Sequence, residues 1–299
     1  MRRSLLVLAA FIAFAAIYIL TSSNKKLDQA IVIPATDETE KAAEIQNAVD
    51  GLHGQKKSAD ELKYERAVDL SLISDDIKSK AEAGDIIAQR IYGSMLEECF
   101  TYSVSKKTYK EDLDARGKIA PELRDLYARF GAKVEARCKN FTVNMPIHIK
   151  DAYLWYALAA MKKDAQSMAK VLTRMGVEKL DDGSLNEGVD FIIASKDPDA
   201  MMELANVMGA HNQSRASALG QFSGSERNEY AWRLAACRLG ADCSANAQIV
   251  TNFCLYGGAI SACTGNGLQE VIRRDVLAPR EYEAALNLST EIINSLPRP

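Results

Sequence analysis

Apolar residues recur along most of the chain at intervals of three and four, which is the spacing of one face of an α-helix. This pattern predicts a first helix over residues 58–83, opened by a capping box in which Ser58 and Glu61 satisfy each other's free backbone amides. The apolar positions expected to pack in it are Leu62, Val68, Leu72, Ile73 and Ile77. Residues 101–120 are lysine-rich and irregular, and they are expected to form a loop or a frayed helix.

Helix-start residues divide the rest of the chain into further helical segments. Such residues are Asp85, Pro121, Asp197 with Pro198, Ser225 and Pro279, and Ser184 with Glu187 has the spacing of a second capping box. Two more helices are expected over residues 149–162 and 165–175. No pair of alternating segments indicates strands, so the predicted fold class is all-α.

The N-terminus carries an apolar segment of a different kind. Arg2 and Arg3 precede an apolar run from Leu5 to Leu20, and its 16 residues lie at the short edge of the length that spans a membrane. We expect residues 1–23 to be an uncleaved membrane anchor, and a cleaved signal peptide is the alternative. Residues 24–57 are polar and are expected to form a tether, which leaves residues 58–299 as the α-helical domain.

The six cysteines all lie in the expected helical domain, at Cys99, Cys138, Cys237, Cys243, Cys254 and Cys263. An even number of this size indicates structural disulfides in an oxidising compartment, with local pairing as the simplest arrangement. The spacings fit no familiar zinc site, and a catalytic thiol would need a histidine partner. We therefore expect a single-pass inner-membrane protein with a periplasmic body, or a protein released into the periplasm after signal cleavage.

Charge and motifs argue against several functions. A net charge of −3 without a basic cluster argues against a nucleic-acid partner. Three scattered histidines indicate no metal site, and the chain has no phosphate-binding loop, nucleophile elbow or zinc-protease motif. We therefore expect no catalytic residue and no cofactor. The alternative is an enzyme that acts on the cell envelope and cleaves the wall with one acidic residue, for which Glu97 or Glu98 is the best candidate.

Three stretches share alanine pairs, a short polar break and a helix restart. They are Ala81 to Gly93 with the turn Gly84-Asp85, then Ala152-x-x-Trp155-Tyr156-x-x-Ala159-Ala160 followed by Asp164-Ala165, and Ala231-Trp232-x-x-Ala235-Ala236 followed by Leu239-Gly240-Ala241. Small alanines let antiparallel helices approach closely, the tryptophan fills the space beside them, and glycine or aspartate forms the turn.

These stretches resemble the Sel-one-like repeat, a relative of the tetratricopeptide repeat. The chain departs from that family where Lys163 replaces the usual turn glycine. The 79 residues from Asp85 to Asp164 are about twice a repeat unit, so an intervening unit would be degenerate. The resemblance implies a superhelix of stacked antiparallel helix pairs that binds other proteins on its concave face.

Only structural residues carry over from that resemblance, namely Trp155, Ala159, Ala160, Trp232, Ala235 and Ala236. The predicted function is a membrane-tethered extracytoplasmic scaffold, not an enzyme, with an unidentified protein partner. An inhibitor or immunity-type protein is a further alternative, which a stoichiometric toxin partner would reveal.

Overall fold

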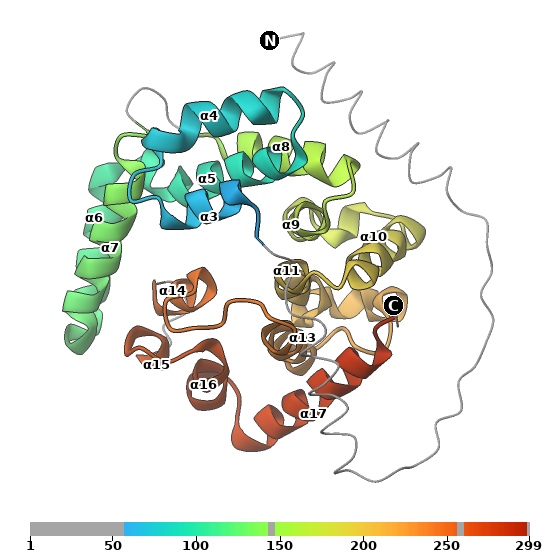
Figure 1. Ribbon diagram of the computed structural model, residues 1–299. Coiled ribbons are helices and arrows are strands. Elements are labelled where there is room, and N and C mark those ends of the chain that lie inside the picture. The colour runs from blue at the N-terminus through green and yellow to red at the C-terminus, as the bar shows by residue number, and fades with distance from the viewer. Residues whose placement is uncertain (1–56, 143–146, 256–259, 298–299) are drawn as a thin grey trace.

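The computed structural model describes residues 57–142, 147–255 and 260–297, and these residues form helices and no strand (Figure 1). The predicted all-α fold class is therefore confirmed. The expected anchor, residues 1–23, and all but the last residue of the expected tether, residues 24–57, lie outside the described residues. Within the described ranges, no helix combines the length and the apolar character needed to cross a membrane.

The described helices are α3 (Ala59–Arg66), α4 (Ser71–Glu82), α5 (Ile86–Val104), α6 (Lys106–Ile119), α7 (Arg124–Cys138), α8 (Ile149–Met161), α9 (Ala165–Met175), α10 (Asp182–Ser195), α11 (Pro198–Met208), α12 (Ala216–Leu219), α13 (Glu226–Arg238), α14 (Gln248–Leu255), α15 (Ile260–Cys263), α16 (Leu268–Val271) and α17 (Pro279–Ser295). Segments of 3-10 helix are η1 (Pro121–Leu123), η2 (Val177–Lys179) and η3 (Ala210–Arg215), and η4 (Ile272–Val276) is a π-helical turn.

The helices follow one another around a curve, as Figure 1 shows. Helix α4 packs on α5, α5 on α8, α8 on α9, α9 on α11, α11 on α13 and α13 on α17. In this view α4, α8 and α10 lie toward the outside of the curve, and α5, α9 and α11 toward the inside. The curve brings α14 against α7, and Nη1 of Arg116 donates a 2.6 Å hydrogen bond to the carbonyl oxygen of Leu255.

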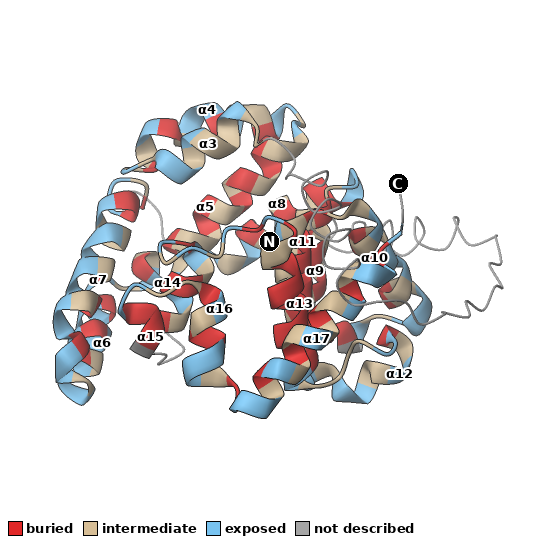
Figure 2. Cartoon of the chain, turned by 60° about the horizontal axis from the view of Figure 1, so that its bottom comes forward, coloured by how far each residue is buried: buried red, intermediate tan, exposed pale blue. Residues whose placement is uncertain are grey.

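Buried residues, red in Figure 2, are most concentrated on α11 and α13. More than half of the residues of α11 and of α13 are buried. Among the largest fully buried side chains are Trp232, Tyr102, Tyr156, Met201 and Leu204. They lie on α5, α8, α11 and α13, and each stabilises the fold by about 2 kcal/mol relative to an exposed side chain.

The first helix is shorter than the sequence predicts. Helix α3 ends at Arg66, and Ala67 has an extended conformation. The guanidinium of Arg137 on α7 donates to the carbonyl oxygen of Ala67, so a tertiary contact satisfies a backbone group that the break leaves open. The prediction of one continuous helix is wrong there. Val68 and Leu72, which were predicted to pack, are 74% and 76% exposed.

Residues 101–120 are helical, so the prediction of a loop or frayed helix is also wrong. They complete α5 and form α6, which pairs with α7 as an antiparallel hairpin (Figure 1). Tyr109 and Leu113 of α6 are buried, and a Cβ at Gly131 of α7 would collide with Leu113. The lysines of α6 lie on its exposed face, which is why the sequence looks irregular.

The predicted helix starts are confirmed, with one exception. Asp85, Asp197 and Ser225 each accept a backbone hydrogen bond at the start of their helices. The exception is α10, where Asp181 accepts the amide hydrogen of Ser184 at 2.9 Å. The predicted capping box at Ser184 is therefore wrong, because Asp181 starts the helix three residues earlier.

Candidate functional site

The turns at three of the repeated stretches have the same backbone geometry. Gly84, Lys163 and Gly240 have left-handed φ values of 94°, 67° and 110°. In each turn the following amide closes a bond to a carbonyl five residues earlier: Asp85 to Lys80 at 3.0 Å, Asp164 to Ala159 at 3.2 Å and Ala241 to Ala236 at 3.0 Å. This is the Schellman closure of a helix C-terminus. Lys163 thus takes the left-handed conformation that Gly84 and Gly240 have in the other two turns.

A fourth turn of related form occurs between α10 and α11, where the sequence did not reveal a repeat. Lys196 has a left-handed φ of 54°, and Asp197 caps the next helix. Here the amide of Asp197 donates to the hydroxyl of Ser195 at 3.1 Å. In the other three turns the corresponding amide donates to a backbone carbonyl five residues earlier. Asp197 follows Asp164 by 33 residues, which is close to the length of a tetratricopeptide unit.

The residues carried over from the resemblance lie mostly in the helix interfaces. The four alanines Ala159, Ala160, Ala235 and Ala236 are buried. Trp232 is 1% exposed, and its indole N–H donates to the carbonyl oxygen of Phe222 at 2.9 Å. Trp155 differs because it is only partly buried.

The six cysteines form three local disulfides: Cys99–Cys138, Cys237–Cys243 and Cys254–Cys263. The first links α5 to α7 across 39 residues, and the other two close short segments around α13 and α14. No free cysteine remains in the part of the chain described here. All six therefore contribute to stability through cross-links.

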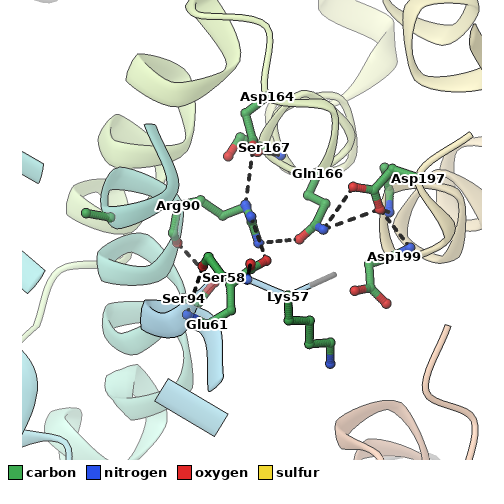
Figure 3. Close-up of polar contacts among 12 residues, drawn as sticks. Lys57, Ser58, Glu61, Arg90, Ser94, Asp164, Gln166, Ser167, Asp197 and Asp199 are labelled. Carbon is green, nitrogen blue, oxygen red and sulfur yellow. Dashed lines mark hydrogen bonds and ion pairs between the residues drawn. The ribbon is translucent and has the colours of Figure 1, made fainter. Parts of the chain in front are cut away.

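A network of charged and polar side chains (Figure 3) joins α3 to α5, α9 and α11, which lie toward the inside of the curve in Figure 1. Arg90 of α5 is its centre, and its guanidinium donates to Glu61 at 2.9 Å, to Asp164 at 3.2 Å and to Gln166 at 2.5 Å. Gln166 in turn donates to both carboxylate oxygens of Asp197, at 3.0 and 3.3 Å. The network therefore ties α3 and α5 to the starts of α9 and α11.

The carboxylates of this network also cap the helices on which they lie. Oδ1 of Asp164 accepts the amide hydrogen of Ser167 at 2.7 Å, and Oδ1 of Asp197 accepts that of Ala200 at 2.9 Å. Glu61 completes the capping box of α3. Each negative charge thus lies at a helix N-terminus, where the helix dipole stabilises it. The carboxylates at the starts of α3 and α9 therefore also bind Arg90, and the carboxylate at the start of α11 binds Gln166.

The electrostatics of the network favour its ionised form. Burial opposes the charge of Arg90, but Asp164 and Glu61 raise its pKa above the usual value. Burial likewise opposes ionisation of Glu61, and hydrogen bonds from Ser58 and Arg90 lower its pKa. The side chains of Arg90, Glu61 and Asp164 are only 12–17% exposed, so solvent screens them weakly.

Two further charged residues, Lys57 and Asp199, border this network and reach solvent; we call them the inner rim (Figure 3). The carboxylate of Asp199 accepts no hydrogen bond from any described residue. Its pKa is raised by burial and then by the like charge of Asp197, although the side chain is accessible at the surface. Lys57 pairs with Glu65, and Asp199 and Asp242 lie close enough to raise its pKa further against the opposing effect of burial.

Glu97 and Glu98, the acidic residues considered for wall cleavage, both lie in ion pairs. Glu97 is 3.0 Å from Nζ of Lys170 and 2.7 Å from Nη2 of Arg174. Burial opposes its ionisation, but these two cations lower the pKa of Glu97 to about 2. Glu97 is therefore ionised at neutral pH and holds no proton for general acid catalysis. Glu98 accepts two hydrogen bonds from Arg137, at 2.5 and 3.0 Å.

Sequence reasoning missed Arg90 and Gln166, because both lie inside helices whose periodicity marks only the packed face. The signal that was available is the aspartate after each turn, at Asp85, Asp164 and Asp197. Among the described residues, no three His, Cys, Asp or Glu side chains are placed to hold a metal ion. No family model, no curated protein and no solved structure matches the chain.

Proposed function

We propose that this chain is an extracytoplasmic scaffold of stacked Sel-one-like helix pairs, held at a membrane by residues 1–23, and that it binds another protein at its inner face. The pairs are α4 with α5, α8 with α9, and α10 with α11. A helix pair of this kind buries its apolar side only against its neighbours, so a curved stack with an open inner surface is the expected result.

The recurrent turn is the observation that carries this proposal. Gly84, Lys163 and Lys196 each have a left-handed conformation and each precede an aspartate that caps the following helix. A lysine in that conformation costs more than a glycine, so its presence at two of three turns indicates that the turn geometry is required by the stack.

The disulfides support the location. Three cross-links involving every cysteine indicate an oxidising, extracytoplasmic environment. The proposed membrane attachment rests on the apolar run from Leu5 to Leu20 and on the charge of Arg2 and Arg3 before it.

The inner rim supports binding rather than catalysis. Its two opposite charges, on Lys57 and Asp199, are accessible beside a network in which Arg90 fixes the surrounding helices. Rigid elements that present charged groups suit recognition of a partner with complementary charges. Glu97 lies in a fixed ion pair, which suits a structural role for that carboxylate.

Co-purification tests this function. The full chain, solubilised from the membrane without reductant, is expected to elute with one partner protein in a fixed ratio. The double variant Lys57→Glu/Asp199→Lys should lose that partner, because it reverses both rim charges. The variant Lys118→Glu reverses an exposed charge on the α6–α7 hairpin and should keep it. Elution of the wild type alone, or equal loss from both variants, contradicts the proposal.

A further inference from the structure

The disulfide Cys237–Cys243 differs from the other two in its access to solvent. Both of its cysteines are partly exposed, whereas the other four cysteines are at most 3% exposed. A thiolate attacks a disulfide only where it can reach a sulfur atom. Thiol chemistry is therefore expected at Cys237–Cys243 before either of the other two disulfides.

This disulfide lies in the wall of a hollow of about 570 Å³, which we call the disulfide hollow. The rest of the wall comes from the start of α16, from α16 itself, from η4 and from α17, with Gly267, Gln269, Glu270, Arg273 and Tyr282. Sites that bind small molecules have volumes of roughly 300–1,000 Å³. The disulfide hollow thus has the size of a small-molecule site, and the sulfur atoms form part of its wall.

The disulfide hollow carries charges of both signs. Arg273 and Glu270 form an ion pair at 2.6 Å, and Nη1 of Arg273 donates to no described residue. Arg274 lies 3.9 Å from Glu270, and the exposed Asp242 precedes Cys243 in the chain. A ligand that carries both a carboxylate and an ammonium group can pair with both signs, and the carboxylate matches the guanidinium of Arg273.

Backbone contacts hold the segment around Cys243 independently of the disulfide. The amide of Ala241 donates to the carbonyl oxygen of Ala236 at 3.0 Å, and the amide of Leu268 donates to that of Cys243 at 2.9 Å. A Cβ at Gly267 would lie 2.8 Å from the same oxygen of Cys243, so the start of α16 packs closely on this segment. These contacts keep the wall of the hollow in place when the S–S bond opens, and they allow the bond to form again.

We propose that the disulfide hollow binds a small thiol that carries a carboxylate and an ammonium group, and that this thiol forms a mixed disulfide with one of the two cysteines. The carboxylate of the ligand pairs with Arg273 and its ammonium group with Glu270. This inference goes beyond the scaffold function, because it adds a modification site that is independent of Lys57 and Asp199.

The exchange step needs no further reactant. The thiolate of the ligand attacks one sulfur atom of Cys237–Cys243, a bond forms between the two sulfur atoms, and the original S–S bond breaks. The second cysteine leaves as a thiolate and takes a proton from water. The sulfur of the ligand is oxidised and the released cysteine is reduced, so the electrons balance.

The rate of mixed-disulfide formation tests the inference with the full chain. The probe is glutathione, a tripeptide thiol with two carboxylates and one ammonium group, and the control is its diethyl ester, in which both carboxylates are neutral. Acid quenching and peptide mass spectrometry measure the modified cysteine. With glutathione the initial rate should level off as its concentration rises, because binding precedes exchange. With the ester at equal thiolate concentration the rate should rise linearly and start about tenfold lower.

Two arginine variants separate binding in the hollow from general attraction. Arg273→Gln, at an exposed position in the wall, should abolish the levelling of the rate with glutathione. Arg280→Gln removes the same charge from the exposed first turn of α17, outside the hollow, and should leave the rate curve unchanged. Both variants should keep the helical circular dichroism. Cys237→Ser/Cys243→Ser should take up no glutathione.

A linear rate with glutathione that equals the rate with the ester, or equal effects of the two arginine variants, overturns the inference. Modification of a buried cysteine before Cys237 or Cys243 also overturns it. None of these results bears on the scaffold function, because the partner captured through Lys57 and Asp199 is measured without any thiol. Loss of that partner would likewise leave the rate curves unchanged.

Discussion

Nε of Arg90 lies 3.2 Å from Oδ2 of Asp164, and this ion pair joins the second turn of α5 to the start of α9. The same carboxylate caps α9 through its other oxygen. One aspartate thus fixes both the start of a helix and its position against the preceding helix pair. The contact explains how a chain with short turns can hold its helices at a defined curvature.

Replacement of Arg90 should destabilise the fold strongly. Arg90→Met leaves Glu61 and Asp164 without their cation in a site that water screens weakly, and it should cost about 3 kcal/mol of unfolding free energy. Arg90→Lys should recover only part of this, because a single ammonium cannot reproduce three contacts of the guanidinium. Urea unfolding measures both variants.

A matched control for this prediction is Lys118→Met, at an exposed site on α6, which should change the unfolding free energy by less than about 0.5 kcal/mol. A double-mutant cycle of Arg90→Met with Glu61→Gln should show coupling. Additive effects of the two substitutions would contradict the role given to the network.

Glu97 should make the free energy of unfolding depend on pH in the acid range. Its pKa is about 2 in the fold and 4.5 as its ordinary value, so its contribution is present above pH 4.5 and is lost as the pH falls toward 2. The contribution is about 3 kcal/mol at neutral pH. The difference in unfolding free energy between the wild type and Glu97→Gln should therefore shrink from pH 5 to pH 2. A constant difference over that range would refute the assignment.

The three disulfides should differ in their rate of reduction. Cys237 and Cys243 are partly exposed and line a surface hollow of about 570 Å³ with Glu270 and Arg273. The other four cysteines are buried. Because thiol–disulfide exchange requires access to sulfur, limiting dithiothreitol should open Cys237–Cys243 first. Alkylation and peptide mass spectrometry report the order, and earlier opening of Cys99–Cys138 would be the contrary result.

Replacement of Lys163, which has a left-handed backbone conformation, by glycine should raise the free energy of unfolding. Lys163→Gly removes the steric cost of a φ of 67° and should stabilise the fold by about 1 kcal/mol. The same substitution at Lys150, in the exposed first turn of α8, should instead destabilise by up to about 1 kcal/mol. Thermal unfolding distinguishes them, and equal effects would show that the turn at Lys163 is unstrained.

Local signals in the sequence predicted much of this fold. Asp85, Ser225 and Pro279 marked helix starts correctly, because capping and fixed φ angles depend on neighbouring residues alone. The break after Arg66 was missed because its cause is Arg137, a residue distant in the sequence. Helix α6 was missed because its lysines dilute the apolar pattern.

The candidate sites were less predictable than the fold. The aspartates at positions 164 and 197 were visible as helix starts, but the contacts of Asp164 with Arg90 and of Asp197 with Gln166 depend on how the helices stack. The same limit applies to Trp155. Trp155 precedes its alanine pair by four residues and Trp232 by three, and only the structure shows that Trp155 is partly exposed while Trp232 is buried.

Site-specific photocrosslinking in living cells tests the scaffold function most directly. A photoreactive amino acid at position 199, on the inner rim, should give one crosslinked product with a partner protein. The same group at position 118, on the exposed face of α6, should give none. No product at position 199, or the same product at both positions, would contradict partner binding at the inner face.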